Sequence, residues 1–531
     1  MHKRVALSFF TMMIVFGLLV LNMAIIVIET EISPSSQSTN ARSIVLSTSR
    51  GMIYDCNMKR LVNNSSSYVT VCLPTTDAFD SISKTVTEEE KTNIYENMTA
   101  GKVSILATAE IFNEPHLKSI EITDRYSYNQ PCVHLIGHLN ENGEGAIGLE
   151  KTYENYLSQQ VGELRAIWGV DALNHILYGE VITTKRNGYL SPAGIQLTID
   201  LNIQQIAEDV LKEFNIGKGA AVVMNSETAE ILACASVPEF NPLDLSSAMN
   251  NADSPFINRA TTPYSVGSVF KPFVATVTLE NNIDFMHNCT GSIEVNGTIF
   301  NCSDTTAHGT VNLTSAMEMS CNTYFIALGQ KLGSEKILSL CSDFGFGKSV
   351  ELADNMYLKA GSLPTAESIT SSQALANLCF GQGELLTSPV QMASAYCVFA
   401  NGGYYRPPTL MRGIVDKNGE IIQRVELPKA CRIISETTAK RIDEILESVV
   451  TNGNAKRAYS EFCECHGKTA TAQSGWYKNG VEINHTWFCG YFTVNNKKYV
   501  AVIFKEDGVS GSVDCAPVFK ELAERVYNKL A

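Results

Sequence analysis

The stretch YSVGSVFKPFV occupies positions 264–274 and sets a serine three residues before a lysine. A glycine ends a turn-like segment, and apolar residues then recur at helical spacing. Pro272 fits such a helix only near its first turn, where backbone N–H groups have no helical partner. Ser268 is therefore predicted at a helix N-terminus, with Lys271 one turn on and on the same face. The N–H groups favour a developing oxyanion, and a lysine with a lowered pKa can take the serine's proton.

The S-x-x-K pattern alone has a simpler interpretation, a capped helix followed by a surface lysine. Ser81-Ile82-Ser83-Lys84 matches the same pattern in a region without companion motifs. A second element, Ser320-Cys321-Asn322, follows an apolar-periodic stretch at 313–319. It offers another hydroxyl for proton transfer and an amide that can hold a substrate peptide group. The two elements together indicate acyl-transfer chemistry more strongly than either does alone.

A third element, Lys468-Thr469-Ala470-Thr471, precedes the C-terminal strands. A lysine and a hydroxyl on a strand edge can bind a carboxylate, while the edge itself hydrogen-bonds an extended peptide. Gly-Lys-Thr could also end a phosphate-binding loop, but that motif requires glycine at position 462, where the chain has Phe462. The phosphate-loop interpretation is therefore excluded.

The order S-x-x-K, S-x-N and K-T-(G) resembles class B penicillin-binding proteins, which are monofunctional transpeptidases. The resemblance covers nearly the whole chain, because other segments match in the same order. These segments are Ser49 to Asp55, Gly145 to Glu150, Leu197 to Asp200 with Gln204 and Gln205, Phe380 to Gly383 with Thr387, Pro389, Gln391 and Asn401 to Gly403, and His485 to Tyr491. Many co-ordered matches make coincidence of single motifs an insufficient explanation.

The resemblance implies a peptidoglycan D,D-transpeptidase, a serine acyltransferase that is sensitive to penicillin. Ser268 would attack the D-Ala–D-Ala carbonyl of a stem peptide, and D-Ala would leave. The acyl-enzyme would pass to an amine on a neighbouring strand. Lys271 would be the general base, and Ser320 would relay the proton to the leaving amine. β-Lactams would acylate the same serine, and the resemblance implies neither a cofactor nor a metal.

The remaining residues of the predicted site would bind substrate. Asn322 would orient the substrate amide. Lys468 and Thr469 would steer the terminal carboxylate, with Thr471 assisting. Backbone N–H groups of Ser268 and Thr471 would form the oxyanion hole.

The chain has 531 residues, enough for two or three domains. We predict a cytoplasmic tip and anchor at 1–30, a linker and non-catalytic pedestal at 31–190, and a transpeptidase domain at 191–531. The fold class is α+β: a transmembrane helix, an elongated mixed pedestal, then an antiparallel sheet flanked by helices. In the last domain, patterns predict strands at 195–199, 220–224, 231–236, 487–493 and 499–505, and helices at 202–214 and from 517. The sheet would join both ends of the domain.

The N-terminus indicates a membrane anchor. Val5 to Ile28 carries no charge and is long enough to span a bilayer. Lys3 and Arg4 precede it, which predicts a cytoplasmic N-terminus and a catalytic domain outside the cell membrane. A cleaved signal peptide is the alternative, but its apolar region would be shorter and would end at a small-residue cleavage site.

Charge and cysteine content limit the partners. The net charge of −14 argues against nucleic acid, which requires a basic surface. Fifteen cysteines could pair outside the cytoplasm or stay as thiols in a cell that lives without oxygen. Cys289 and Cys302, which flank a short segment, are the expected pair. Cys463-x-Cys465-His466 resembles a metal half-site but lacks a second ligand pair at zinc spacing.

Two positions depart from the family pattern. Ala470 stands where the family has glycine, and we expect this small side chain to be tolerated; the alternative is weakened β-lactam acylation or lost catalysis. The turn at 225–230 starts with Asn225 and has Ala229 at its fifth position, where Asp and Gly are usual. We expect only a changed turn type there.

Two rival functions share the fold. A membrane-anchored β-lactam sensor or β-lactamase would not need the pedestal at 41–190. A non-catalytic scaffold would not need intact Ser268, Lys271, Ser320 and Asn322, although Ala470 keeps that alternative open. The family resemblance also implies peptidoglycan stem peptides, β-lactams and a SEDS-type glycosyltransferase as partners. It does not distinguish elongation, division or sporulation.

Overall fold

The computed structural model describes residues 12–13, 16–17 and 40–531, except 109, 178–180, 304 and 370. The predicted anchor, Val5 to Ile28, lies outside the described residues apart from 12–13 and 16–17. Among the helices that are described, none combines the length and the apolar character needed to cross a membrane.

The chain divides into two compact units that alternate along the sequence. The first comprises residues 1–49, 66–123 and 162–189, and the second comprises 50–65, 124–161 and 190–531. Two segments of the expected pedestal, 50–65 and 124–161, therefore cluster with the C-terminal part of the chain. The predicted domain limits at 30 and 190 stay a prediction, although the last change of unit also falls between Tyr189 and Leu190.

Within its described residues, the first unit contains two sheets and two helices. One sheet has the strand order β1-β7-β8 and the other β4-β3-β6-β5. The elements are β1 (Ala41–Ser49), β3 (Ser65–Cys72), α2 (Thr76–Ile82), α3 (Glu88–Thr99), β4 (Ser104–Ala107), β5 (Asn113–Glu114), β6 (Leu117–Asp124), β7 (Gly162–Gly169) and β8 (Thr183–Asn187). Helix α3 begins with a reciprocal capping box between Thr87 and Glu90. Ile94 of α3 and Ile82 of α2 pack with Leu117 in the core of this unit.

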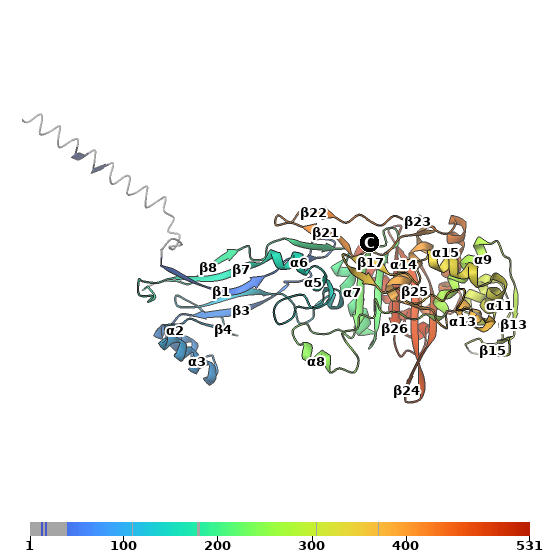
Figure 1. Ribbon diagram of the computed structural model, residues 1–531, viewed down its shortest axis with the longest axis horizontal. Helices are drawn as coiled ribbons and strands as arrows, with labels where there is room; N and C mark the ends of the chain where they lie inside the picture. The colour runs from blue at the N-terminus through green and yellow to red at the C-terminus, as the bar shows by residue number, and fades with distance from the viewer. Residues whose placement is uncertain are drawn as a thin grey trace, which may run out of the picture. The chain divides into compact units, whose positions relative to one another are not determined.

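A five-stranded sheet organises the second unit, in the order β11-β10-β26-β25-β24. Its strands are β10 (Gly219–Asn225), β11 (Ile231–Val237), β24 (Cys465–Lys478), β25 (Val481–Val494) and β26 (Lys497–Lys505). Every neighbouring pair is antiparallel. The sheet thus joins the start and the end of the unit, as predicted. The β24–β25 hairpin extends beyond the neighbouring strands (Figure 1).

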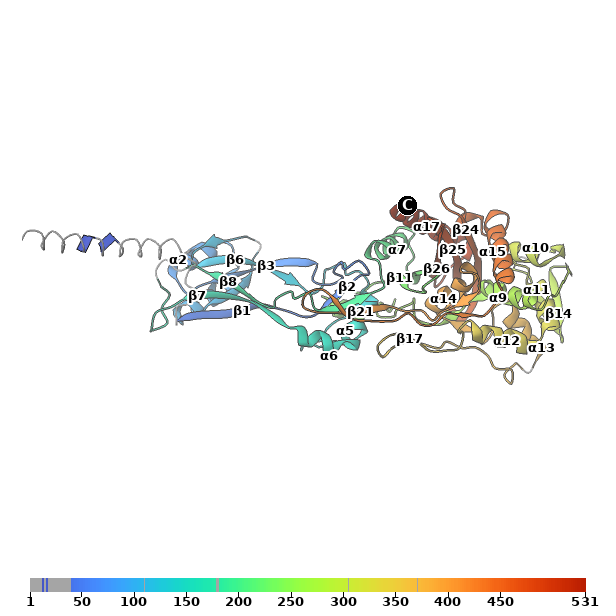
Figure 2. The same ribbon diagram turned by 90° about the horizontal axis from the view of Figure 1, so that it is seen from above.

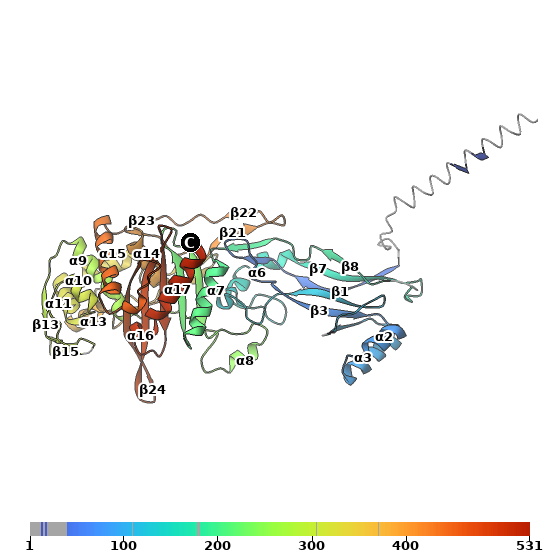
Figure 3. The ribbon, with the colours of Figure 1, turned by 180° about the vertical axis from the view of Figure 1, so that it is seen from behind.

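Helices cover both faces of this sheet, which confirms the predicted α+β arrangement. α7 (Leu201–Glu213) and α17 (Ala516–Leu530) lie on one face, and α14 (Pro389–Ala400) lies on the other (Figure 2). α7 and α17 are seen side by side in Figure 3. Asp200 caps α7 by accepting hydrogen bonds from two backbone N–H groups, and a proline stands at the start of α17 as predicted. α14 is apolar on all sides because it is buried throughout.

The other helical elements of this unit are α4 (Val133–Ile136), α5 (Gly148–Thr152), α6 (Glu154–Leu157), η1 (Ser158–Gln160), α8 (Leu245–Met249), η2 (Gly267–Phe270), α9 (Lys271–Glu280), α10 (Leu313–Glu318), α11 (Asn322–Leu332), α12 (Ser334–Asp343), α13 (Ser372–Cys379), α15 (Glu436–Thr451), η3 (Lys456–Ala458) and α16 (Gly511–Asp514). The remaining strands are β2 (Met52–Tyr54), β9 (Gly194–Leu197), β12 (Tyr264–Ser265), β13 (His287–Cys289), β14 (Ser292–Val295), β15 (Thr298–Asn301), β16 (Gly309–Val311), β17 (Val350–Ala353), β18 (Met356–Leu358), β19 (Leu386–Thr387), β20 (Tyr404–Tyr405), β21 (Met411–Val415), β22 (Ile421–Arg424) and β23 (Cys431–Arg432).

Candidate active site

Ser268 lies in the short 3-10 turn η2, directly before helix α9. The α-helix proper begins at Lys271, three residues later than the sequence pattern predicts, with Pro272 in its first turn. Because residues three apart overlie one another in a 3-10 turn, Ser268 and Lys271 still share a face. Gly267 has φ of +64°, and its N–H donates to the carbonyl of Gly381 at 2.8 Å. This glycine sets the direction from which the serine enters the site.

The side chain of Lys271 is completely buried. Its Nζ donates to the carbonyl oxygen of Ser320 at 2.7 Å, to Ser320 Oγ at 3.1 Å and to Asn322 Oδ1 at 2.7 Å. Burial lowers the pKa of Lys271 to about 7, because the charged ammonium loses its hydration. A lysine in this state can accept a proton near neutral pH, which is what a general base requires.

The second motif lies between helices α10 and α11. Ser320 adopts φ of +53°, a left-handed conformation that is uncommon outside glycine. Asn322 is the first residue of α11, and its side-chain amide donates to the carbonyl of Asn301 at 2.9 Å. The amide is therefore held on both sides, by Lys271 and by Asn301, so its orientation is determined before substrate arrives.

The third motif lies on β24, the edge strand of the central sheet. Lys468 is completely buried, and its Nζ donates to the carbonyl of Thr469 at 3.1 Å. Burial, together with the positive charge of Lys271, holds the pKa of Lys468 well below its usual range. Thr469 Oγ1 donates to Asn454 Oδ1 at 3.3 Å, and Thr471 Oγ1 accepts from the N–H of Gly511 at 3.4 Å.

A pocket of about 440 Å³ joins the three motifs. Its lining includes Ser268, Ser320, Thr469, Ala470 and Thr471. All three predicted motifs therefore meet in one place, although Ser268 and Ser320 are 52 residues apart and Lys468 follows Ser320 after a further 148. The roles assigned to the individual residues stay predictions.

The other sequence matches are not part of this pocket. Ser81 to Lys84 lies at the end of α2 in the first unit, where Ser81 Oγ donates to Glu114 at 2.9 Å. His466 is hydrogen-bonded at 3.1 Å to the carbonyl of Asp443, and its ring stacks on Tyr491. Ser81 and His466 thus make contacts within the local structure, outside the pocket.

Sequence reasoning missed several residues of the pocket. Ser303 and His308 line it from the segment before β16, Asn454 from the segment after α15, and Val509 to Ser512 from the segment before and at the start of α16. Individual polar residues in such segments carry no spacing signal. Only the order of the three motifs could be recognised in the sequence.

The tight packing beside Ala470 explains how the third motif is held. A side chain at Gly511 would meet the carbonyl of Trp487 at 2.3 Å and the carbonyl of Ala470 at 2.5 Å. The backbone at Gly511 therefore lies directly against β24 and β25. Ala470 itself is buried and keeps its antiparallel pairing with Trp487, so the methyl group is accommodated without a break in the strand.

Comparison with known proteins shows which family the chain resembles. The family model "Penicillin binding protein transpeptidase domain" matches residues 219–524. Stage V sporulation protein D of Bacillus subtilis is 30% identical over 397 residues, covering 71% of this chain and 59% of that protein. The peptidoglycan D,D-transpeptidase FtsI homolog of Mesostigma viride is 26% identical over 479 residues, covering 81% and 77%. The chain thus spans less than two thirds of the Bacillus protein.

Solved structures share the fold. A chain in a peptidoglycan synthase complex that coordinates polymerization and crosslinking aligns with a TM-score of 0.69 at 24% identity, over 98% of both chains. Because the family model covers more than half of the sequence and includes all three motifs, the chain belongs to the penicillin-binding protein transpeptidase family, and the resemblance to its class B members is confirmed.

Proposed function

We propose that this protein is a peptidoglycan D,D-transpeptidase that works through a Ser268 acyl-enzyme. The observation that carries the proposal is the buried Lys271 amine, which is hydrogen-bonded to Asn322 and to Ser320, a residue that lines the same pocket as Ser268. The names of the Mesostigma relative and of the MrdA proteins, which are D,D-transpeptidases, support the same enzyme class.

In the first half-reaction, Ser268 Oγ attacks the carbonyl between two D-alanines of a stem peptide. Its proton passes to Nζ of Lys271, and the C–N bond breaks as an ester forms. Ser320, hydrogen-bonded to Lys271 at 3.1 Å, lies where it can relay that proton to the departing amine of D-Ala. In the second half-reaction, an amine of another stem peptide attacks the ester, the crosslinking amide forms, and Ser268 regains its proton.

Lys468, the second buried lysine, would bind the C-terminal carboxylate of the stem peptide together with Thr469. Neither Lys271 nor Lys468 forms an ion pair within the part of the chain that the structure describes. A bound carboxylate beside Lys468 and Thr469 would stabilise the charged amine and raise its pKa again. β24 is an edge strand, so its free side can also hydrogen-bond an extended peptide.

The proposal extends to the location of the enzyme. Val5 to Ile28 would anchor the chain in the cell membrane by a single helix, with the N-terminus in the cytoplasm and the pocket outside. The domains would follow the predicted limits of 31–190 for the pedestal and 191–531 for the transpeptidase. The likeness to a chain of a peptidoglycan synthase complex supports a SEDS-type glycosyltransferase as partner.

The test is to incubate the full chain, purified in detergent, with a penicillin and record its intact mass over time beside Ser268→Ala. A persistent single adduct that the variant lacks is expected. The same preparation would then receive a stem peptide and an acceptor amine, and D-Ala release with formation of the amide product is the expected outcome. Drug turnover without a lasting adduct would instead identify a β-lactamase. No adduct, combined with no D-Ala release, would refute acyl transfer and favour a scaffold.

A further inference from the structure

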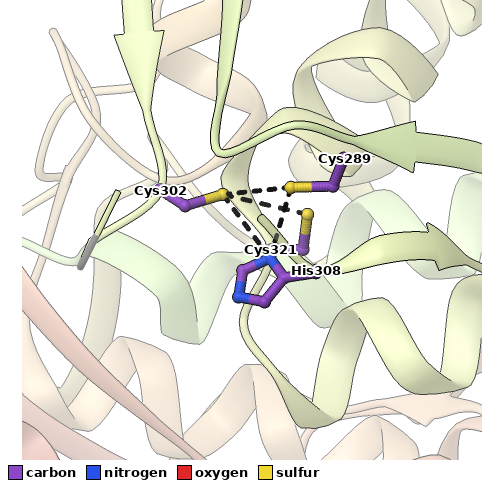
Figure 4. A group of neighbouring side chains, drawn as sticks. All are labelled: Cys289, Cys302, His308 and Cys321. Carbon is purple, nitrogen blue, oxygen red and sulfur yellow. Dashed lines mark hydrogen bonds between the residues drawn. The ribbon is translucent and has the colours of Figure 1, made fainter. Parts of the chain in front are cut away.

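Three thiols and one imidazole converge beside the second motif. They come from four separate positions of the second unit: the end of β13, the residue after β15, the residue before β16, and the residue before α11 (Figure 4). These residues, called here the Cys3His cluster, are Cys289, Cys302, His308 and Cys321. Their ligand atoms all lie within 4.8 Å of one another.

The spacing of these atoms is that of a tetrahedral metal site. The sulfur atoms of Cys289 and Cys302 are 3.8 Å apart, and those of Cys302 and Cys321 are 3.9 Å apart. The Nδ1 atom of His308 lies 3.3 Å from the first sulfur and 3.7 Å from the second. Zn–S bonds of about 2.3 Å and a Zn–N bond of about 2.0 Å at tetrahedral angles require S–S and S–N distances of about 3.8 and 3.6 Å.

The donor set selects the ion. Three cysteines and one histidine form one of the recurring ligand sets of structural zinc, and soft thiolates exclude Mg²⁺ and Ca²⁺. Cys289, Cys302 and Cys321 are buried, and His308 is half-buried and lines the active-site pocket. We propose that the Cys3His cluster binds one Zn²⁺ with all four positions filled by protein.

The position of Cys321 links the proposed metal site to the second motif. It stands between Ser320 and Asn322, the two residues that receive hydrogen bonds from Lys271. Asn322 already donates to the carbonyl of Asn301, the residue before Cys302. A metal bridge from Cys321 to Cys302 would add a second link between the same two segments. The ion would thus hold the second motif in place without touching substrate, and Cys321 would be a positioning residue.

From the sequence we expected no metal and favoured a disulfide pair between Cys289 and Cys302. In the structure both are free thiols, close together but not bonded. The four ligands escaped detection because no two stand two to four residues apart, the spacing that marks zinc motifs in sequences. A disulfide between Cys289 and Cys302 would leave Cys321 and His308 without their shared partner, so the two interpretations predict different chemistry.

The test measures the metal content of the full chain, purified in detergent without chelator, by inductively coupled plasma mass spectrometry. One zinc per chain that survives dialysis is expected. Cys302→Ala and His308→Ala should lose it, whereas Cys234→Ala, which removes a buried cysteine outside the cluster, should keep it. Replacing the ion with Co²⁺ should give the visible bands and the sulfur-to-metal charge-transfer band of a tetrahedral thiolate site.

Wild-type protein without zinc that also fails to take up Zn²⁺ or Co²⁺ after reduction would overturn the proposal. A Cys289–Cys302 disulfide that persists in fully active protein would overturn it as well. The positioning role rests on the proposed function and has a separate readout: removing zinc should slow penicillin acylation about tenfold, and added Zn²⁺ should restore the rate. Because metal content is measured without any substrate, failure of the acylation assay in all samples would count against the function and leave the site standing.

Discussion

Gly381→Ala should displace Ser268, the proposed nucleophile, although Gly381 has no proposed role in the chemistry. Gly381 has φ of +79°, and its carbonyl accepts the N–H of Gly267 at 2.8 Å. A methyl group there would stand 2.0 Å from the carbonyl oxygen of Gly267 and 2.9 Å from Cβ of Phe270. The first contact is with backbone, so no side-chain rotation relieves it. The peptide that leads into Ser268 must move by about 1 Å or more.

The size of the effect follows from this displacement. Misplacing a reacting group by about 1 Å can lower a rate about 100-fold, which corresponds to about 2.7 kcal/mol in the barrier. The left-handed backbone adds a stability cost of about 1–2 kcal/mol for any alanine at this position. The assay is the second-order rate of acylation by a fluorescent penicillin, corrected for the folded fraction, together with the thermal midpoint.

Gly383→Ala is the matched control in the same loop. Gly383 has φ of +85°, so it has the same backbone cost, but a methyl group there would meet only Cβ of Asn377 at an ordinary 3.5 Å. This variant should lose similar stability and acylate at nearly the wild-type rate. Equal acylation rates in the two variants would refute the reasoning, because only the Gly381 variant has the close contacts with Gly267 and Phe270.

Three further predictions concern the base, the third motif and a buried ion-pair network. The acylation rate should rise as pH increases through about 7 and then level off. Lys271 accepts a proton only when it is neutral, and burial lowers its pKa to about 7. A rate that rises only near pH 10 would contradict this. Ala470→Gly should change the rate of penicillin acylation by less than about threefold and lower the free energy of unfolding by about 1 kcal/mol. Acylation kinetics and thermal melting measure the two effects. A variant that is acylated much faster would show that the methyl group obstructs the ligand. Glu150→Gln should lower the free energy of unfolding by about 3 kcal/mol, because fully buried Glu150 pairs with Arg50 at 2.9 Å and with Arg125 at 2.7 Å. An unchanged thermal midpoint would contradict this prediction.

The sheet of the second unit could be predicted from the sequence because its strands are continuously apolar where helices cover both faces. Patterns at 220–224, 231–236 and 499–505 correspond to β10, β11 and β26. The far end of β24 could not be predicted, since residues 473–478 are mostly exposed and do not alternate between polar and apolar side chains. Their strand conformation comes from pairing with β25 in a long hairpin, which local propensity does not encode.

The turn at 225–230 shows how a departure from the family pattern is absorbed. Asn225 Oδ1 accepts hydrogen bonds from the N–H groups of Glu227 at 2.9 Å and Thr228 at 3.1 Å, as an aspartate would. Ala229 adopts φ of +54°, the conformation for which the family's glycine is suited. The turn therefore adopts a backbone conformation that favours glycine at position 229, and the expected change of turn type stays a prediction.

No local sequence pattern could predict that the two units alternate along the chain. Segments 50–65 and 124–161 join the second unit through long-range contacts, such as the parallel pairing of β2 with β9 and the ion pair of Arg50 with Glu150. Each partner looks like an ordinary strand or surface charge in sequence. The family resemblance singled out Ser49 to Asp55 and Gly145 to Glu150 as matches in the family's order, but it did not predict their contact.

The residues of the three motifs were recognisable because each motif places its groups within four consecutive positions. The Cys3His cluster was not, because its geometry comes from four chain segments that each supply one ligand. Yet the cluster meets the second motif at Cys321, where the local pattern showed only an arbitrary residue between Ser320 and Asn322. Lys271 needs Ser320 and Asn322 in fixed positions, and Ser320 is held in a left-handed conformation that its own residue type does not favour. Two local hydrogen bonds at the end of α10 stabilise that conformation, from the N–H of Ser320 to Met317 at 3.1 Å and from the N–H of Cys321 to Ala316 at 2.8 Å. A metal bound through Cys321 would add a longer-range link to the same backbone.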